Sequence, residues 1–327
     1  MRNTHMKAMV IKELNSELTM LEWEKPQYTA KEVLVKVLTT SLNFADRLMI
    51  GGNYQEKPKL PFGVGMEICG SVVAVGAKVK KFKLGDRVSS YIGYGGTVEY
   101  VSLPESKCFK VPDEISDEEA CCLMLAYASS DLALNYKAQL KFGETLLVLG
   151  ATSAVGLVAI ELGKIAGARV IAVARGSSKC RLAREKGADI AINSETENFA
   201  ERLKSIGGAD VVYDPIGGEE FSKALSVTNP EGRILPVGFA SGHVPKIPAN
   251  IIMVKNVTVI GFNIALYKEF KEEILAECFK RAIRDCAEKL VSPLISQIFN
   301  LEKANDALKA FRERKGSGKI VIRVSKS

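Results

Sequence analysis

A turn of small residues between Gly150 and Gly156 could bind the pyrophosphate of a dinucleotide. It follows the apolar run 145–149, and a helix-like stretch and a second apolar run complete the unit at residue 174. A helix that begins directly after such a turn points free backbone N–H groups and the positive end of its dipole at an anion. An ordinary strand-to-helix turn is the alternative, because only the last glycine of a GxGxxG pattern is kept. The expected contacts are Thr152, Ser153, Ala154 and Val155.

The end of the second apolar run indicates which cofactor would bind. NAD enzymes place an acidic side chain there to hold the ribose hydroxyls, whereas this chain has Ala174. Arg175, Ser177 and Lys179 follow, and they offer cations and a hydroxyl to a 2′-phosphate. A solvated polar surface turn is the alternative. The pattern favours NADPH over NADH.

Six short apolar runs alternate with helical spacers, which indicates an α/β protein with a doubly wound parallel sheet. After the first two, the runs cover 189–193, 210–215, 233–237 and 258–262, with amphipathic spacers at 199–205 and 219–226. Such sheets bind ligands beyond the carboxyl ends of their strands, where the turns 215–218 and 238–241 stand. The further expected cofactor contacts are Ile216, Val237, Phe239 and Asn263.

Composition narrows the class of protein. The chain has 327 residues, 47% of them hydrophobic and 25% charged, which is enough for two domains with full cores. Its net charge of +7 is spread along the chain, so no nucleic-acid partner is expected. The opening residues lack a signal-peptide pattern and no apolar stretch could span a membrane, which predicts a cytoplasmic protein.

Cysteine and histidine usage argues against a metal centre. The seven cysteines show no CxxC spacing and only two histidines are present, so we expect neither a disulfide framework nor a zinc cluster. The cysteines are interpreted as small buried hydrophobic residues. The stretch 269–290 predicts one amphipathic helix with an apolar packing face.

The first 125 residues are a different kind of sequence, with short strands such as 32–38 and 69–75 between glycine turns. The segments 61–67, 70–76, 85–88, 95–105 and 318–322 resemble the medium-chain dehydrogenases/reductases. The resemblance implies a GroES-like β-barrel catalytic domain at 1–125, a Rossmann NADPH-binding domain at 126–265, and a C-terminal segment, 266–327, that returns to the catalytic domain.

Two departures separate this chain from the zinc alcohol dehydrogenases of that superfamily. Those enzymes carry a cysteine and a histidine where this chain has Asn43 and Met66, and without them a tetrahedral catalytic zinc is not expected. The stretch 41–54 instead resembles the zinc-independent quinone oxidoreductases, and 244–262 is similar to their quinone oxidoreductase-like protein 2 branch. Membership implies metal-free, NADPH-dependent hydride transfer to a quinone or another conjugated carbonyl.

The resemblance also assigns residues. Asn43 and Ser129 are implied as contacts of the nicotinamide end, although each could cap or bond within a helix. Tyr54 is implied as a substrate-polarising donor, with a half-buried barrel tyrosine as the alternative. With Tyr54, Asn43 makes up the expected catalytic pair. Neighbouring Asp46 and Arg47 are expected to form a structural ion pair, and Glu67 to tie down backbone or an arginine.

Three functions remain open at this point. The first is a quinone reductase, the second an enone, 2-alkenal or enoyl-thioester reductase, and the third a non-catalytic NADPH-binding protein. Relatives often form homodimers through their last cofactor-domain strand, here 258–262. The physiological acceptor, the stereochemistry and the choice between one- and two-electron reduction are not encoded in recognisable residues.

Overall fold

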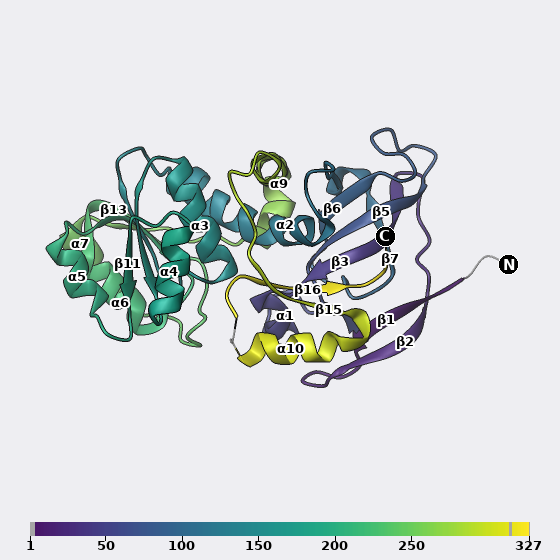
Figure 1. The fold of residues 1–327 in the computed structure, drawn as a ribbon, viewed down its shortest axis with the longest axis horizontal. Coiled ribbons are helices and arrows are strands. Elements are labelled where there is room, and N and C mark those ends of the chain that lie inside the picture. The colour runs from purple at the N-terminus through teal and green to yellow at the C-terminus, as the bar shows by residue number, and fades with distance from the viewer. Residues whose placement is uncertain (1–3, 314–315, 327) are drawn as a thin grey trace. The chain divides into compact units, whose positions relative to one another are not determined.

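The computed structural model describes residues 4–313 and 316–326, so residues 1–3, 314, 315 and 327 of the predicted domains lie outside it. The chain divides into two compact units (Figure 1). Unit 1 comprises residues 1–125, 279–288 and 293–327, and unit 2 comprises 126–278 and 289–292. In the part of the chain that the structure describes, no helix is both long and apolar enough to cross a membrane.

Unit 2 is built on a six-stranded sheet in the order β11-β10-β9-β12-β13-β14, with neighbouring strands parallel. The sheet confirms the doubly wound prediction. Its strands are β9 (Thr145–Val148), β10 (Arg169–Ala174), β11 (Ile190–Asn193), β12 (Ala209–Asp214), β13 (Thr228–Pro236) and β14 (Thr258–Val259). The last strand is shorter than the predicted run 258–262, because only Arg233 and Ile234 of β13 pair with it.

Helices cover both faces of this sheet, as Figure 1 shows for α3 and α4 on one side and α5, α6 and α7 on the other. The buried faces of these strands are almost entirely aliphatic, which is typical of parallel sheets covered on both sides. The helices are α3 (Ala154–Ile165), α4 (Ser177–Glu185), α5 (Phe199–Ser205), α6 (Gly218–Val227) and α7 (Ala249–Lys255).

Unit 1 is a mostly β domain. Its larger sheet has the order β15-β16-β3-β5-β6-β8, with β7 also on β3, and a smaller sheet has the order β2-β1-β4. The strands are β1 (His5–Ile11), β2 (Leu18–Glu24), β3 (Glu32–Ser41), β4 (Phe62–Gly63), β5 (Glu67–Val75), β6 (Arg87–Tyr91), β7 (Tyr100–Pro104), β8 (Phe109–Lys110), β15 (Ile295–Asn300) and β16 (Lys319–Arg323).

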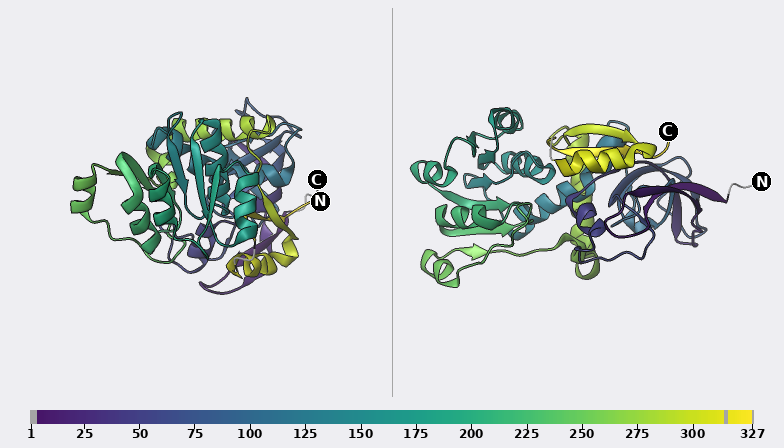
Figure 2. Two further views of the ribbon diagram at one scale, coloured as in Figure 1. Left: turned by 60° about the vertical axis from the view of Figure 1, so that its left-hand side comes forward. Right: turned by 90° about the horizontal axis from the view of Figure 1, so that it is seen from below.

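The C-terminal strands join the sheet that the N-terminal residues begin. Strand β16 pairs antiparallel with β3, so that Val321 stands opposite Ser41. Helix α10 (Ala304–Glu313) lies alongside β15 and β16, as the views in Figure 2 show. This pairing brings residue 319 to the same part of the sheet as residues 41–43, although 276 positions separate it from Asn43.

Two features of the helices and cysteines bear on the sequence predictions. The helix expected at 269–290 is present as α9 (Glu272–Ala287), with narrower bounds than predicted. Helix α8 (Ile264–Phe270) precedes it as a separate helix, because Lys271 leaves helical geometry with φ −150° and ψ 55°. All seven cysteines are buried and unbridged, as the sequence predicted. Helix α1 (Phe44–Ile50) and helix α2 (Asp117–Asp131) complete the elements that carry candidate site residues.

Candidate active site

The turn between β9 and α3 requires small residues. Gly150 has φ +55°, which a residue with a side chain rarely adopts. A Cβ atom on Gly156 would lie 2.5 Å from the carbonyl oxygen of Gly150, so the helix can begin this close to the strand only with glycine there. Ser153 caps the helix, since its Oγ accepts a hydrogen bond of 3.1 Å from the N–H of Gly156.

The N–H groups of Ala154 and Val155 fall in the first turn of α3, where no intrahelical acceptor exists. They and the backbone around Thr152 face the carboxyl edge of the sheet, and the helix dipole adds partial positive charge. Of the predicted contacts, Ser153 uses its hydroxyl as a cap, and the Thr152 side chain is buried. The turn therefore fits a pyrophosphate through its backbone.

The two later turns lie beside the first one. The side chain of Ile216 packs against Gly150. A Cβ atom added to Gly150 would lie 2.7 Å from Cδ1 of Ile216. The N–H of Ala240 donates to the carbonyl of Pro215 at 3.1 Å, and the N–H of Val237 donates to the carbonyl of Asp214 at 2.7 Å. The structure thus brings Ile216, Val237 and the turn containing Phe239 to one edge of unit 2.

Asp214 organises the turn that holds Ile216. Its Oδ1 accepts hydrogen bonds from the N–H groups of Ile216 at 2.7 Å and Gly217 at 3.0 Å, while Oδ2 is buried without a partner. Burial raises the pKa of this carboxyl group, although both N–H donors act to lower it. A carboxylate held this way fixes the backbone at the carboxyl end of β12.

Ser129 and Asn263 also belong to unit 2. Ser129 is 8% exposed on α2, and its neighbour Ser130 joins that helix to α3 by donating from Oγ to the carbonyl of Val155 at 3.1 Å. Asn263 caps α8, since its Oδ1 accepts a hydrogen bond of 2.9 Å from the N–H of Ala265. The side-chain oxygen of Asn263 is thus used to cap the helix.

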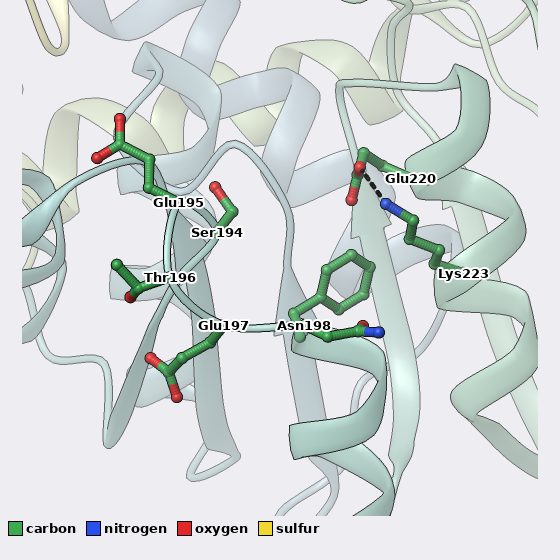
Figure 3. A pocket seen from close by; sticks show the side chains of 8 residues that line it. Ser194, Glu195, Thr196, Glu197, Asn198, Glu220 and Lys223 are labelled. Carbon is green, nitrogen blue, oxygen red and sulfur yellow. Dashed lines mark hydrogen bonds and ion pairs between the residues drawn. The ribbon is translucent and has the colours of Figure 1, made fainter.

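The predicted 2′-phosphate residues surround the beginning of α4. Arg175 and Ser177 are exposed and Lys179 is half-buried. Gly176 is the N-cap of this helix, and its φ of +85° turns the chain sharply after β10. Beside this turn, a hollow of about 400 Å³ is lined by Ser194, Glu195, Thr196, Glu197, Asn198, Phe199, Glu220 and Lys223 (Figure 3).

In unit 1, Glu67 is the centre of a buried hydrogen-bond network. Its Oε1 accepts from Ser41 Oγ at 2.7 Å, Asn43 Nδ2 at 3.1 Å and Lys319 Nζ at 2.6 Å. Its Oε2 accepts from the N–H of Leu125 at 2.8 Å. The prediction that Glu67 ties down backbone is confirmed, but its cation is a lysine and not an arginine.

Lys319 orients Asn43. The lysine is 3% exposed and Glu67 is fully buried, and Nζ also donates to Asn43 Oδ1 at 2.6 Å. Burial alone would lower the pKa of Lys319, but the charge and hydrogen bond of Glu67, together with other neighbouring groups, outweigh burial and the pKa is raised. The ammonium therefore carries its charge at neutral pH, and its hydrogen bond to Oδ1 fixes which end of the half-buried Asn43 amide is the oxygen.

Asp46 caps α1 and does not pair with Arg47, so the predicted ion pair is wrong. Its Oδ2 accepts from the N–H of Asn43 and its Oδ1 from the N–H of Gly65, both at 2.7 Å. Arg47 is exposed on the helix, whereas Asp46 is buried. Burial raises the pKa of Asp46 to about 6, despite these two donors.

Two tyrosines lie near this network. Tyr54 is half-buried, and burial together with Glu56 and Asp46 raises the pKa of its hydroxyl. Tyr91 stands opposite Glu67 across β5 and β6, so both side chains are on the same face of the sheet. Its hydroxyl is buried without a partner, and burial followed by the nearby Tyr54 raises its pKa.

The side chains around Glu67 do not fit a catalytic zinc ion. Zinc sites use thiolate, imidazole and carboxylate ligands, whereas Glu67 is flanked by the buried thioether of Met66, the amide of Asn43 and the ammonium of Lys319. That ammonium would repel a second cation at the carboxylate of the network. Among the described residues, no group of three potential ligands could hold a metal ion.

Sequence reasoning missed Lys319, Tyr91 and Glu195 as functional residues. Lys319 meets Glu67 through strand pairing across 252 positions of the chain, and Tyr91 meets it through the pairing of the neighbouring strands β5 and β6. The ending Gly318-Lys319 was visible in the sequence, but nothing local marked its lysine as buried. Glu195 follows β11, whereas the usual pattern places the ribose-binding acid at the end of the preceding strand, here at Ala174.

Comparison with known proteins agrees with this architecture. A family model described as alcohol dehydrogenase GroES-like domain matches residues 29–113. A second, described as zinc-binding dehydrogenase, matches residues 154–280. The quinone oxidoreductase of Thermus thermophilus, solved alone and with NADPH, is 29% identical with a TM-score of 0.86, covering 97% of this chain and all of that one.

Curated relatives extend over most of the chain. The quinone oxidoreductase-like protein 2 homologue of Nematostella vectensis is 38% identical over 297 residues, which are 89% of this chain and 81% of that protein. Quinone oxidoreductase-like protein 2 of Rattus norvegicus is 33% identical over 98% of this chain and 93% of its own length. The chain therefore belongs to the quinone oxidoreductase-like protein 2 family of medium-chain dehydrogenase/reductase oxidoreductases.

Proposed function

We propose that this oxidoreductase transfers a hydride from NADPH to a quinone or a similar conjugated carbonyl without zinc. The observation that carries the proposal is the position of the Lys319 ammonium. Its Nζ lies 2.6 Å from Glu67 Oε1 and 2.6 Å from Asn43 Oδ1, in the place where a zinc-dependent enzyme needs metal ligands. Without a Lewis acid, the acceptor must spread its developing negative charge by delocalisation. A quinone or an enone does so, and a simple ketone does not.

The cofactor, when bound, supplies the hydride, and the protein's own groups bind and orient the reactants. Tyr54 is proposed to donate its hydroxyl proton to the reduced acceptor oxygen, with water restoring that proton. Its raised pKa keeps it protonated at neutral pH. Asn43, with its amide oxygen turned to Lys319, is proposed to contact the nicotinamide end of the cofactor or the acceptor.

NADPH is proposed as the cofactor because Arg175, Ser177 and Lys179 gather at the beginning of α4. The NADPH complex of the Thermus thermophilus relative supports a nicotinamide cofactor in this fold. Thr152, Ser153, Ala154 and Val155 would hold the pyrophosphate, and Ser129, Ile216, Val237, Phe239 and Asn263 would line the rest of the site.

A homodimer paired through β14 is also proposed. This strand is at the edge of the unit 2 sheet, and the adjacent α7 exposes Ile251, Met253 and Val254. An apolar surface beside a free sheet edge suits a second copy of the chain. Sedimentation at micromolar concentration should give a dimer, and a monomer would refute this arrangement.

The proposed function is tested by initial rates of NADPH oxidation with an ortho-quinone, a para-quinone and a 2-alkenal. We expect turnover of the quinones. Turnover of the alkenal alone would move the assignment to an alkenal reductase. Binding of NADPH without turnover of any acceptor would favour a non-catalytic protein.

The role of Tyr54 has its own test. Tyr54→Phe should lower kcat for quinone reduction about tenfold or more, because general acid catalysis typically contributes at least that much. Tyr91→Phe is the matched control, since it removes a neighbouring hydroxyl that is shielded from ligands. Equal rates for Tyr54→Phe and the wild type would remove Tyr54 from the mechanism.

A further inference from the structure

The loop after β11 is attached to the turn that begins α4. Asn193, the last residue of β11, accepts hydrogen bonds through Oδ1 from the N–H of Gly176 at 2.8 Å and from the N–H of Glu195 at 3.1 Å. One amide oxygen thus holds the backbone of both segments. The position of residue 195 relative to the α4 turn is therefore set by the fold.

The carboxylate of Glu195 lies directly against that turn. A Cβ atom on Gly176 would be 3.3 Å from Oε2 and 3.9 Å from Oε1 of Glu195. Because Gly176 has no side chain, the carboxylate faces bare backbone between Arg175 and Ser177. Dinucleotide-binding sheets hold the adenosine ribose at the end of this second strand.

Charges of both signs lie around the turn. Arg175 and Lys179 supply two cations, and Glu195 and Glu197 supply two anions. Glu220 and Lys223 on the far side of the hollow pair with each other at 2.9 Å and add no net charge (Figure 3). The two loop carboxylates point in different directions, and Glu197 accepts from the N–H of Asn193. Glu195 is the one that meets Gly176.

We propose that Glu195 is a specificity-determining residue that limits the preference for NADPH. It takes the role that an acidic residue at position 174 plays in NAD enzymes, but it reaches the turn from the loop of the neighbouring strand. Its carboxylate accepts hydrogen bonds from the ribose hydroxyls and repels a 2′-phosphate. The chain consequently binds NADH as well as NADPH, with dissociation constants within about tenfold of each other. This inference depends on the proposed function, because it concerns the same cofactor site.

The test is to measure the dissociation constants of NADPH and NADH for the full-length wild type, Glu195→Gln and Glu197→Gln. Fluorescence or calorimetric titration gives these constants. Glu195→Gln keeps the shape of the side chain and removes its charge. We expect this substitution to tighten NADPH binding about threefold to tenfold, because it removes a partly exposed repulsion of the 2′-phosphate. NADH lacks that phosphate, so its binding should not tighten. The gain should shrink at high salt, because surface charges are screened.

Glu197→Gln is the matched control and should change the ratio of the two dissociation constants by less than about twofold. An unchanged ratio in Glu195→Gln would overturn the inference while leaving the proposed cofactor site intact. Failure of the wild type to bind either cofactor would instead refute the proposed function. The two failures are therefore distinguishable in one set of titrations.

Discussion

The candidate residues of unit 1 and those of unit 2 are held in opposite ways. In unit 1, Glu67, Lys319 and Asn43 form a buried network in which side chains satisfy one another. In unit 2, most candidate cofactor residues lie on turns and helix starts at the sheet edge, where the first N–H groups of α3 have no acceptor within the helix. Buried charges are stable only when they are paired, whereas an exposed turn tolerates side-chain changes that leave its backbone intact.

The comparison explains which mutations should matter in each unit. Loss of one charge in the unit 1 network leaves the other charge buried, so stability and activity should fail together. Loss of a side chain on the unit 2 turns should change cofactor affinity with little effect on folding. Only substitutions of the glycines in those turns should change both cofactor affinity and folding.

Removal of the buried lysine should have the largest effect. Lys319→Met strands the Glu67 carboxylate, and we expect the free energy of unfolding to fall by about 3–5 kcal/mol, measured by urea denaturation. Lys223→Met, which breaks an exposed pair with Glu220, should cost at most about 1 kcal/mol. Similar losses in the two variants would show that the network does not stabilise unit 1.

Substitution of Gly156, where α3 begins after β9, should have the next largest effect. Gly156→Val places a side chain against the Gly150 carbonyl, so the helix must move and NADPH should bind at least about tenfold more weakly, a change of about 1.4 kcal/mol. Gly261→Ala is the control, because a Cβ atom there meets nothing within 4 Å. Unchanged NADPH affinity in Gly156→Val, measured by fluorescence titration, would place the pyrophosphate elsewhere.

The pH dependence of stability should report Asp46. Its folded-state pKa of about 6 exceeds the ordinary value of 3.8, so its stabilising contribution is complete below pH 3.8 and is lost as the pH rises to about 6. The wild type should therefore gain about 1 kcal/mol relative to Asp46→Asn when the pH falls from 7 to 5.

Urea denaturation at pH 7, 6 and 5 measures that difference. Asp189→Asn is the control: burial acts to raise the pKa of Asp189, but the hydrogen bonds from Lys164 and the Val170 N–H, together with the Lys164 charge, lower it overall. The control difference should stay constant over this range. A wild-type advantage over Asp46→Asn that shrinks toward pH 5 would contradict the assignment.

The two units also differ in how far the sequence predicted them. The sheet of unit 2 and the turn at Gly150 could be predicted, because the signals of a strand, a turn and a helix are local and follow one another directly along the chain. The helix at 269–290 was predicted a few residues too long at each end, because apolar spacing continues on both sides of Lys271. The Asp46–Arg47 pair was wrongly predicted because adjacency in sequence does not tell which side chain turns inward.

The site of unit 1 could be predicted only in part. Asn43 and Glu67 came from a family resemblance, but the partner that holds them is contributed by β16, 252 residues beyond Glu67. No local pattern encodes such a contact, since it depends on the order in which strands join the sheet. Tyr91 stands opposite Glu67 through the register of the consecutive strands β5 and β6, which no residue pattern in the sequence marks.

The most direct test of the account is quinone-dependent NADPH oxidation by wild-type protein before and after exhaustive dialysis against a chelator, with bound metal quantified in both samples. The account predicts the same rate in both, because the buried ammonium of Lys319 leaves no place for zinc at Glu67. Loss of activity on dialysis with recovery on addition of zinc would contradict it.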